Sequence, residues 1–346
     1  MYKKICNQRG KIILLSCTPT DVNMKTISPR NKTIRLTEAD RERLKPQILR
    51  PEAPCSAEEL TNKIICGDLF EVLDRVPDGV CDLIIADPPY NLDKQFGKTS
   101  FAARSREEYA RYLRSWIPAL CQKLSPTGSL YICCDWGSSS AVEEVLRENL
   151  TILNRITWQR EKGRGAAQNW KNAMEDIWFA VKDPAHYTFN LDAVKQKRRV
   201  IAPYRDSSGP RDWEQEGEVK YRKTCPSNFW DDITVPYWSM AENTEHPTQK
   251  PEKLMAKLVL ASSRKGDLVF DPFGGSGTTA VVANKLGRRF CSVEIDEEYC
   301  LTALRRLEMA VGDKNIQGYT DGYFWERNSS AAQNRAKRTT TKKKKQ

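Results

Sequence analysis

The chain has 346 residues, of which 56 are Lys or Arg and 45 are Asp or Glu, giving a formal net charge of +11. No apolar run approaches the roughly 18 residues that a membrane-spanning helix needs, and the 11 cysteines form no C-x-x-C pair. With 2 histidines and no metal-ligand spacing, a zinc site is not expected, and thiols inside apolar runs indicate a reduced, cytoplasmic protein.

The positive charge is concentrated at the two ends of the chain. Residues 1–50 and 326–346 together carry a net +15, whereas residues 51–325 carry a net −4. A folded part with this balance must bind a polyanion through local patches, so charge alone supports a nucleic-acid partner only weakly. The length allows one large α/β domain with a smaller inserted or appended unit.

The first 60 residues resemble an accessory segment more than a core. They mix charged residues with 5 prolines, and only residues 37–44 follow a helical pattern, with Thr37 as the N-cap. We therefore expect residues 1–60 to form a basic arm or lid. A strand over residues 62–67 follows, with Asp68 at its carboxyl end, before a short helix over residues 69–75.

The apolar run at residues 81–86 predicts a buried strand, which Asp87, Pro88, Pro89 and Tyr90 follow directly. Prolines cannot continue a sheet ladder, so the strand must end there. In open α/β sheets ligands bind at the carboxyl ends of the strands. The segment therefore places a carboxylate, backbone carbonyls and an aromatic ring at the mouth of a pocket.

Strands and helices continue to alternate after this segment. Residues 106–124 have the pattern of one long amphipathic helix, and residues 126–128 (Pro-Thr-Gly) predict a turn. Strands are expected over residues 129–134 and 152–158, with a helix over residues 141–149 between them. This alternation predicts an α/β fold with a mostly parallel, doubly wound sheet and helices on both of its faces.

Periodicity fades between residues 163 and 245, where only residues 176–182 resemble a strand. The stretch is rich in Trp, Tyr, Asn and Arg, whose planar groups read base edges and stack on bases. An irregular structural insertion is the alternative interpretation on composition alone. The candidates for DNA contact are Arg164, Asn169, Lys171, Lys197, Arg198 and Arg199.

The sheet pattern returns after residue 245. Helices are expected over residues 252–262, 280–286 and 296–310, and strands over residues 267–271 and 289–294. Residues 313–346 end in four consecutive lysines and a glutamine, and we expect them to form a basic disordered tail.

A glycine-rich turn at residues 272–279 lies between a predicted strand and a predicted helix, the context that makes such a motif credible. Its glycines let backbone N–H groups and the helix N-terminus approach a polar ligand closely. Glu294 ends the following strand, where it can accept hydrogen bonds from ribose hydroxyls. The turn also fits an NAD-dependent dehydrogenase, but Asp271 before it favours an adenosyl cofactor, and a dehydrogenase leaves Asp87 and Tyr90 without a task.

Three motifs in a fixed order resemble the β-class amino-methyltransferases of DNA, which are S-adenosylmethionine enzymes of bacterial and phage restriction–modification systems. The motifs are Asp87-Pro88-Pro89-Tyr90, His246-Pro247-Thr248-Gln249-Lys250-Pro251 and Asp271-Pro272-Phe273-Gly274-Gly275-Ser276-Gly277-Thr278. The resemblance covers about residues 60–310 and implies a Rossmann-like, seven-stranded methyltransferase sheet. The motif order is circularly permuted, because the catalytic motif precedes the cofactor motif.

The resemblance also implies roles for parts of the chain. Residues 61–162 match the catalytic half of the domain, residues 163–245 the target-recognition region and residues 246–312 the cofactor half. Asp68 and Glu294 match positions that hold the adenine and ribose of S-adenosylmethionine. The methionine side of the cofactor is matched by Asp271, Pro272, Phe273, Gly274, Gly275, Ser276, Gly277, Thr278 and Thr279, and closure of the pocket by His246, Thr248, Gln249 and Lys250. Double-stranded DNA is the implied substrate, and a cognate restriction endonuclease and a homodimer are left open as partners.

The chemistry can be argued from the residues themselves. An exocyclic amine on adenine is a poor nucleophile because its lone pair is delocalised into the ring. Asp87 and the Pro88 carbonyl can each accept one N–H, which localises that lone pair and stabilises the positive charge developing on nitrogen. This geometry requires a base flipped out of the duplex, and Tyr90 is the expected stacking surface.

We therefore predict an adenine-N6 DNA methyltransferase. Cytosine-N4 methylation is the nearest alternative, although the family tends to carry Ser rather than Asp at position 87 for cytosine. A non-catalytic DNA-binding module is disfavoured because Asp87, Tyr90 and Glu294 are intact. A cytosine-C5 mechanism needs a nucleophilic cysteine, and neither Cys55 nor Cys225 follows a predicted strand beside the cofactor turn.

Overall fold

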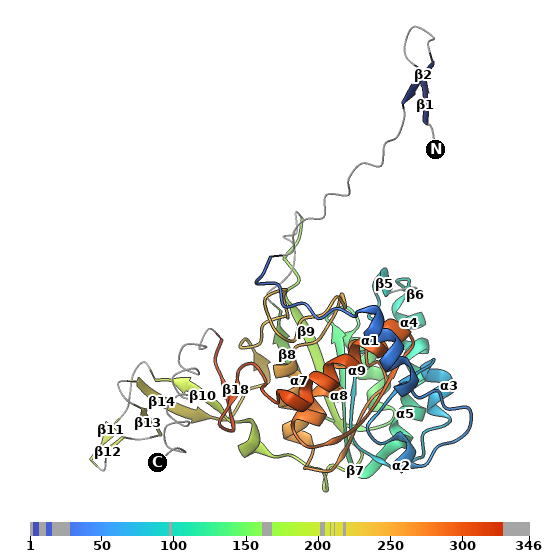
Figure 1. Ribbon diagram of the computed structural model, residues 1–346. Helices are drawn as coiled ribbons and strands as arrows, with labels where there is room; N and C mark the ends of the chain where they lie inside the picture. Colours follow the sequence, from blue (N-terminus) through green and yellow to red (C-terminus); the bar gives the residue numbers. More distant parts are fainter. Residues whose placement is uncertain are drawn as a thin grey trace.

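The computed structural model describes residues 3–6, 12–15, 28–96, 99–160, 168–200, 205–207, 209–210, 212–216 and 219–327. An eight-stranded sheet with helices on both faces forms the centre of the molecule, and a five-stranded sheet lies to one side (Figure 1). The predicted α/β architecture is confirmed. Among the helices within these ranges, none combines the length and hydrophobicity that a membrane crossing requires.

The large sheet has the strand order β15-β8-β9-β7-β4-β16-β17-β3. Its strands are β3 (Lys63–Cys66), β4 (Cys81–Ala86), β7 (Leu124–Asp135), β8 (Thr151–Gln159), β9 (Met174–Val181), β15 (Phe229–Trp230), β16 (Leu268–Asp271) and β17 (Arg289–Glu294). All neighbours are parallel except β9, which runs antiparallel to β7 and β8. The resemblance implied seven strands, and the additional one is the two-residue edge strand β15.

Helices cover the two faces of this sheet and bury two separate hydrophobic clusters. The helices are α1 (Glu38–Leu44), α2 (Ala57–Leu60), α3 (Leu69–Leu73), α4 (Arg106–Arg114), α5 (Ile117–Lys123), α6 (Ser139–Arg147), α7 (Glu252–Ser262), α8 (Thr278–Lys285) and α9 (Glu297–Gly312), with short 3-10 helices η1 (Lys45–Gln47) and η2 (Leu191–Val194).

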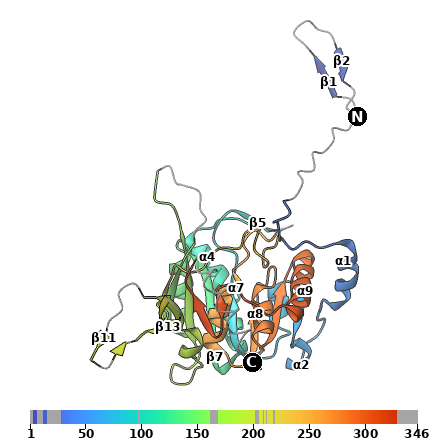
Figure 2. The same ribbon diagram turned by 60° about the vertical axis from the view of Figure 1, so that its left-hand side comes forward.

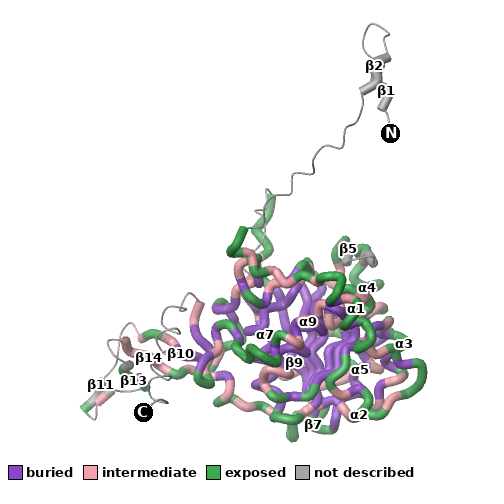
Figure 3. The backbone as a smooth tube through the Cα atoms, in the orientation of Figure 1, coloured by how far each residue is buried: buried purple, intermediate pink, exposed green. Residues whose placement is uncertain are grey.

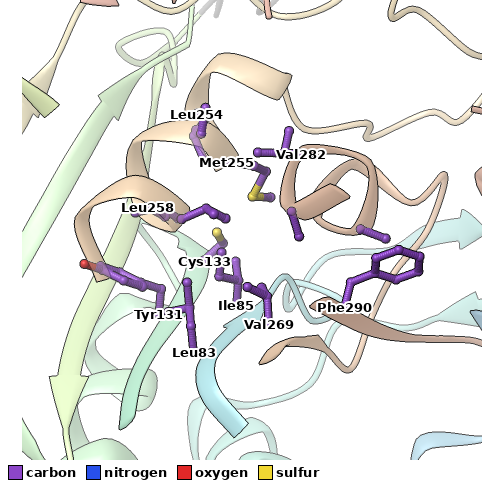
Figure 4. Packing of buried hydrophobic residues seen from close by; sticks show 14 of the residues in the cluster. Leu83, Ile85, Tyr131, Cys133, Leu254, Met255, Leu258, Val269, Val282 and Phe290 are labelled. Carbon is purple, nitrogen blue, oxygen red and sulfur yellow. The ribbon is translucent and has the colours of Figure 1, made fainter. Parts of the chain in front are cut away.

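The two-residue period of β4 explains both clusters. Leu83 and Ile85 pack with α7, α8 and α9, whereas Ile84 and Ala86 pack with α3 to α6. Figure 4 shows Leu83 and Ile85 facing the helices of the first cluster. Figure 3 shows that the buried residues concentrate along the centre of this sheet and the helices beside it. A strand buried on both faces has to be apolar throughout, as this one is.

The strand order creates a crevice at the carboxyl end of β4. This strand pairs with β7 on one side and with β16 on the other. The chain continues from β4 to β7 and from β16 to β17, so the connections leave in opposite directions. Ligands bind outside the carboxyl ends of the strands at such a switch point.

Two predictions about the first half of this domain are wrong. The helix expected over residues 106–124 is divided into α4 and α5, because the chain turns at Ser115 and Trp116 and Pro118 lies in the first turn of α5. Pro118 has no N–H to continue the helical hydrogen bonds. Residues 126–128, expected to form a turn, lie inside β7, where its pairing with β4 shifts register.

Residues 28–60 are part of the domain rather than an arm or lid. Leu44 of α1 is completely buried in the cluster beneath α7 to α9. Arg41 pairs with Glu298 of α9 at 3.0 Å, and Leu49 forms a parallel bridge with Ile65 of β3. Figure 1 shows α1 lying against α9.

Described residues between 163 and 245 and the segment after α9 share the five-stranded sheet, in the order β13-β14-β10-β19-β18. Its strands are β10 (Gln196–Arg199), β13 (Glu214–Glu216), β14 (Val219–Thr224), β18 (Tyr319–Thr320) and β19 (Tyr323–Trp325). Residues 163–245 were therefore wrongly expected to hold a single strand. The prediction of a disordered tail over residues 313–346 is also wrong for residues 313–327, which include β18 and β19. Residues 328–346 lie outside the described residues. Figure 2 shows β13 beyond the edge of the large sheet.

Three two-stranded ladders complete the described strands. They are β1 (Lys3–Cys6) with β2 (Ile12–Leu15), β5 (Lys94–Phe96) with β6 (Thr99–Phe101), and β11 (Arg205–Asp206) with β12 (Gly209–Pro210). All three are antiparallel, and β5 with β6 lies between the Asp87–Tyr90 segment and α4 along the chain.

Candidate active site

Residues from all three predicted motifs line one cavity of about 340 Å³ at the carboxyl edge of the large sheet. The predicted residues in its wall are Asp68, Asp87, Pro88, Pro89, Tyr90, His246, Thr248, Lys250, Pro272, Phe273, Gly275 and Glu294. They come from the ends of β3, β4, β16 and β17 and from the segment before α7. Parallel strands explain this convergence, because their carboxyl ends meet at one edge of the sheet.

The Asp87–Tyr90 segment leaves β4 as expected, since that strand ends at Ala86. Tyr109 of α4 donates a hydrogen bond to the Pro89 carbonyl at 3.1 Å and fixes the turn. Within the described part of the chain, no donor reaches the Pro88 carbonyl. Pro88 lines the cavity, so its carbonyl is a candidate acceptor for a bound molecule.

Lys250 contacts the Asp87–Tyr90 segment directly. Its Nζ donates to Asp87 Oδ1 at 2.7 Å and Oδ2 at 2.6 Å, and to the Tyr90 hydroxyl at 3.0 Å. Only 7% of the Lys250 side chain is exposed. Burial alone would lower the pKa of Lys250, but the charges of Asp87 and Glu175 outweigh it and raise that pKa. Lys250 is therefore a fixed cation beside the Asp87 carboxylate.

A second carboxylate orients the Tyr90 ring. The Tyr90 hydroxyl lies 2.9 Å from Asp87 Oδ1 and 3.0 Å from Glu175 Oε2, and its single proton can serve one of them at a time. Glu175 is held by Arg160 at 2.5 Å. Burial would raise the pKa of Glu175, but Lys250 and Arg160 hold it below its ordinary value. Burial raises the pKa of the Tyr90 phenol, so this hydroxyl keeps its proton.

The glycine turn approaches its neighbours too closely for side chains. Gly275 and Gly277 have φ values of +51° and +75°, in the left-handed region that favours glycine. A Cβ on Gly275 would lie 2.9 Å from His246 Nε2, and one on Gly277 would lie 2.4 Å from Ala303 Cβ. The turn therefore packs closely against α9 at Gly277 and against the segment before α7 at Gly275.

Two acidic residues flank this turn. Glu294 accepts the Gly275 N–H at 2.8 Å and the Asp296 N–H at 2.9 Å, which aims its carboxylate along the cavity wall. Burial raises the pKa of Glu294, and burial also raises the pKa of Asp271 to about 7. Asp271 accepts the Phe273 N–H at 3.0 Å, so it shapes the turn.

Some predicted residues support the cavity without lining it. They are Gln249, Asp271, Gly274, Ser276, Gly277, Thr278 and Thr279. Gln249 is buried and bonds to Thr244 and to the Glu242 carbonyl. Arg306 of α9 donates to the Ser276 carbonyl and the Thr278 hydroxyl, both at 2.9 Å.

The DNA-contact candidates occupy two places. Asn169 and Lys171 are exposed on the segment before β9, where Asn172 and Met174 line the cavity. Lys197, Arg198 and Arg199 lie on β10 of the five-stranded sheet, and Lys197 is stacked over Tyr221 and Trp325 at 4.8 and 4.9 Å. Arg164 lies outside the described residues.

Sequence reasoning missed four charged residues of the cavity wall, Asp135, Arg160, Glu175 and Asp296. A signal existed for Asp135, because it follows an apolar strand just as Asp87 does. The sequence also offered a signal for Glu175, which is the second residue of the apolar strand β9, where an unpaired carboxylate would be costly to bury. Nothing in the sequence indicated its partners.

The sequence matches a described protein family and several of its curated relatives. The family model described as "DNA methylase" matches residues 81–305. DNA adenine methyltransferase YhdJ of Escherichia coli (strain K12) is 36% identical over 253 residues, covering 71% of this chain and 83% of that protein. Type II methyltransferase M.HpaI of Haemophilus parainfluenzae is 31% identical over 251 residues, covering 72% and 75%.

Solved structures share the fold. The PvuII DNA methyltransferase, described as cytosine-N4-specific, superposes with a TM-score of 0.53 and 18% identity, covering 76% of this chain and 93% of that one. TTHA0409 from Thermus thermophilus, complexed with S-adenosyl-L-methionine, gives 0.50 and 20%, covering 77% and 98%. At these identities the similarity describes the architecture alone.

Proposed function

The chain belongs to the DNA methylase family, and from this premise we propose that it methylates the N6 amino group of adenine in double-stranded DNA, with S-adenosylmethionine as the methyl donor. The observation that carries the proposal is that the Asp87–Tyr90 segment and the glycine turn line the same cavity. A DNA base and an adenosyl cofactor must meet in just such a space.

The cavity residues fit the proposed cofactor. Glu294 and Asp68 offer carboxylates for its hydroxyl and amino donors, and Phe273 and Ile295 offer apolar surface for its flat adenine. The left-handed glycines let the turn lie against His246 and Ala303, because a Cβ at Gly275 or Gly277 would collide with these neighbours. S-adenosylmethionine supplies an electrophilic methyl group attached to a positively charged sulfur, and the several carboxylates of this wall complement that charge.

Asp87 and the Pro88 carbonyl are the acceptors for the two N–H bonds of the target amine. A carboxylate offers about four lone-pair directions, and Lys250 and Tyr90 use only part of that set at Asp87. Accepting both N–H bonds localises the nitrogen lone pair. The acceptors strengthen as positive charge grows on nitrogen, which lowers the barrier selectively.

Tyr90 is the surface on which the flipped base stacks. Its hydroxyl is anchored by Asp87, Glu175 and Lys250, so the ring is held in one orientation before the base arrives. Such preorganisation reduces the entropy lost on binding. Stacking of a base on an aromatic side chain contributes about 1–3 kcal/mol.

The choice of adenine over cytosine rests on two observations. The Escherichia coli relative is described as a DNA adenine methyltransferase, and an Asp rather than a Ser occupies position 87. Type II relatives also support a role in restriction–modification. In that setting the partners are double-stranded DNA and a cognate endonuclease, with a homodimer as a further assembly. The basic strand β10 is then a second DNA contact, through Arg198 and Arg199.

The direct experiment is transfer of a radiolabelled methyl group from S-adenosylmethionine to DNA, followed by digestion to nucleosides. We expect the label in N6-methyl-2′-deoxyadenosine. Label in N4-methyl-2′-deoxycytidine would reject the adenine assignment while keeping the reaction class. If the protein binds S-adenosylmethionine in a calorimetric titration but leaves the DNA unlabelled, the proposed function itself is rejected.

A further inference from the structure

Trp170 has no packing role that the fold explains. It is 94% exposed, the largest exposed fraction among the big apolar side chains in the described ranges. Its backbone N–H is fixed by Asn169 Oδ1 at 2.7 Å, whereas its indole projects into solvent. A single exposed apolar side chain is common on protein surfaces, so what Trp170 can do depends on where it lies in the fold.

The place of Trp170 in the fold identifies the surface. It belongs to the connection between β8 and β9, whose base is formed by residues of the active-site wall. Arg160 and Ala173 join across that base through an N–H···O bond of 2.7 Å, and Arg160 pairs with Glu175. Trp170 is three residues from Ala173, so it lies within about 10 Å of the cavity wall along the chain.

The neighbours of Trp170 suit a nucleic acid. Asn169 and Lys171 flank it, and both are exposed. Asn is suited to base edges and Lys to phosphates. The segment contains no acidic residue between 168 and 174 to repel a phosphate backbone. A polyanionic duplex with apolar base faces therefore fits this segment.

We propose that Trp170 enters the DNA stack at the target position and occupies the space that the flipped base leaves. This role rests on the proposed function, because only a base-flipping enzyme creates such a gap. Extruding a base costs its stacking and pairing energy, and that cost is least for a base that is already unpaired. Apolar side chains inserted between base steps stabilise opened duplexes, and the indole face replaces part of the lost stacking.

The proposal predicts a defect that depends on pairing of the target base. Trp170→Ala should lower kcat/KM on a fully paired duplex by about tenfold to a hundredfold, the amount expected from one lost aromatic–base stack. Most of that loss should be recovered when the base opposite the target is replaced by an abasic site. Trp170→Phe, which keeps an aromatic face, should fall between Trp170→Ala and the wild type.

A fluorescent reporter tests the same step without turnover. With 2-aminopurine at the target position, wild-type enzyme should raise the fluorescence by unstacking the base, and Trp170→Ala should raise it less. Phe229→Ala is the matched control, because Phe229 is 52% exposed but lies on the edge strand β15, outside the wall of this cavity. That variant should behave as the wild type does on every substrate.

Several results would overturn the role of Trp170. An unchanged rate for Trp170→Ala, or an equal loss on the paired and abasic duplexes, would contradict a role in flipping. A change in sedimentation of the free protein would assign Trp170 to a contact between copies of this chain. Failure of the wild type to methylate adenine at all would instead reject the proposed function, so the two failures are distinguishable.

Discussion

Replacing Lys250 with methionine tests the electrostatics of the active site. The change keeps the length of the side chain and removes its ammonium group, which lies 2.7 and 2.6 Å from the two Asp87 oxygens and 3.4 Å from Glu175. Two carboxylates then share one site with Arg160 as their only remaining cation among the described cavity residues.

The structure sets the size of the effect. Removing one partner of a fully buried ion pair costs about 3–5 kcal/mol. The Asp87 side chain is 18% exposed and faces the cavity, where water can solvate it. We therefore expect Lys250→Met to lower the free energy of unfolding by only about 2–3 kcal/mol. Loss of the anchored Asp87 and Tyr90 geometry should lower kcat by about 10² to 10³.

Lys253→Met provides the matched control. Lys253 is equally buried, at 7%, but pairs with Asp232 at 2.6 Å rather than with Asp87. Its Nζ also donates to the Trp325 carbonyl of β19. We expect a similar loss of stability, measured by urea unfolding, and a raised KM for DNA with kcat largely preserved.

The assay is single-turnover methylation of a duplex, combined with calorimetry of S-adenosylmethionine. Lys250→Met should bind the cofactor within about threefold of the wild type while losing turnover. If Lys250→Met loses affinity for S-adenosylmethionine but transfers methyl groups at the normal rate when the cofactor is saturating, Lys250 is instead a cofactor ligand, as the sequence motif alone implied. Wild-type kcat in this variant would refute the electrostatic reasoning.

Three further predictions concern the cofactor turn and the second carboxylate. Burial raises the pKa of Asp271 from 3.8 in the unfolded chain to about 7 in the folded protein. Below pH 3.8 the carboxyl is protonated in both the folded and the unfolded protein, whereas between pH 3.8 and about 7 only the folded protein keeps the proton. The contribution of Asp271 to the free energy of unfolding therefore falls as the pH rises through this window. Asp271→Asn should therefore raise the free energy of unfolding of cofactor-free protein by about 2–4 kcal/mol at pH 8 and by less than about 1 kcal/mol at pH 4, measured by urea titration; an equal gain at both pH values would contradict this. Gly277→Ala should cost about 2–4 kcal/mol, because its Cβ would overlap Ala303, whereas Gly266→Ala, which is also left-handed but has open space around it, should cost about 1 kcal/mol. Glu175→Gln keeps the hydrogen bond to Tyr90 but removes a charge, and should lower kcat by about tenfold with unchanged cofactor affinity; a normal kcat would mean that the charge is dispensable.

Local patterns predicted the elements that build the site. The β17 strand and the α7 helix have the bounds expected from their apolar residues, and β4 ends where Pro88 and Pro89 require. These elements are buried, and their hydrophobic period follows directly from packing on the sheet. The same reasoning located both halves of the cavity.

The five-stranded sheet could not be predicted in the same way. Its strands β10 and β14 are polar, and they are stabilised by Lys197 and Lys223 stacked over Tyr221, Trp325 and Tyr323. Such contacts have no period along the chain. The strand β19 also comes from the far end of the sequence, so its pairing depends on tertiary structure.

The role of Lys250 could not be predicted for a related reason. Its motif indicated a cofactor pocket, and Lys250 does line the cavity. The length of its side chain lets it reach across to Asp87, however, and that contact depends on how the segment before α7 packs against β4. A sequence motif identifies the neighbourhood of a residue and leaves its partner undetermined.

The central claim is that Asp87 activates the target amine inside a cavity shared with the cofactor. Its most direct test compares transfer of a labelled methyl group to DNA by the wild type and by Asp87→Asn, with the affinity for S-adenosylmethionine measured on both. We predict that transfer falls by at least about a hundredfold in Asp87→Asn while cofactor binding persists. Transfer at the wild-type rate by Asp87→Asn would contradict the account.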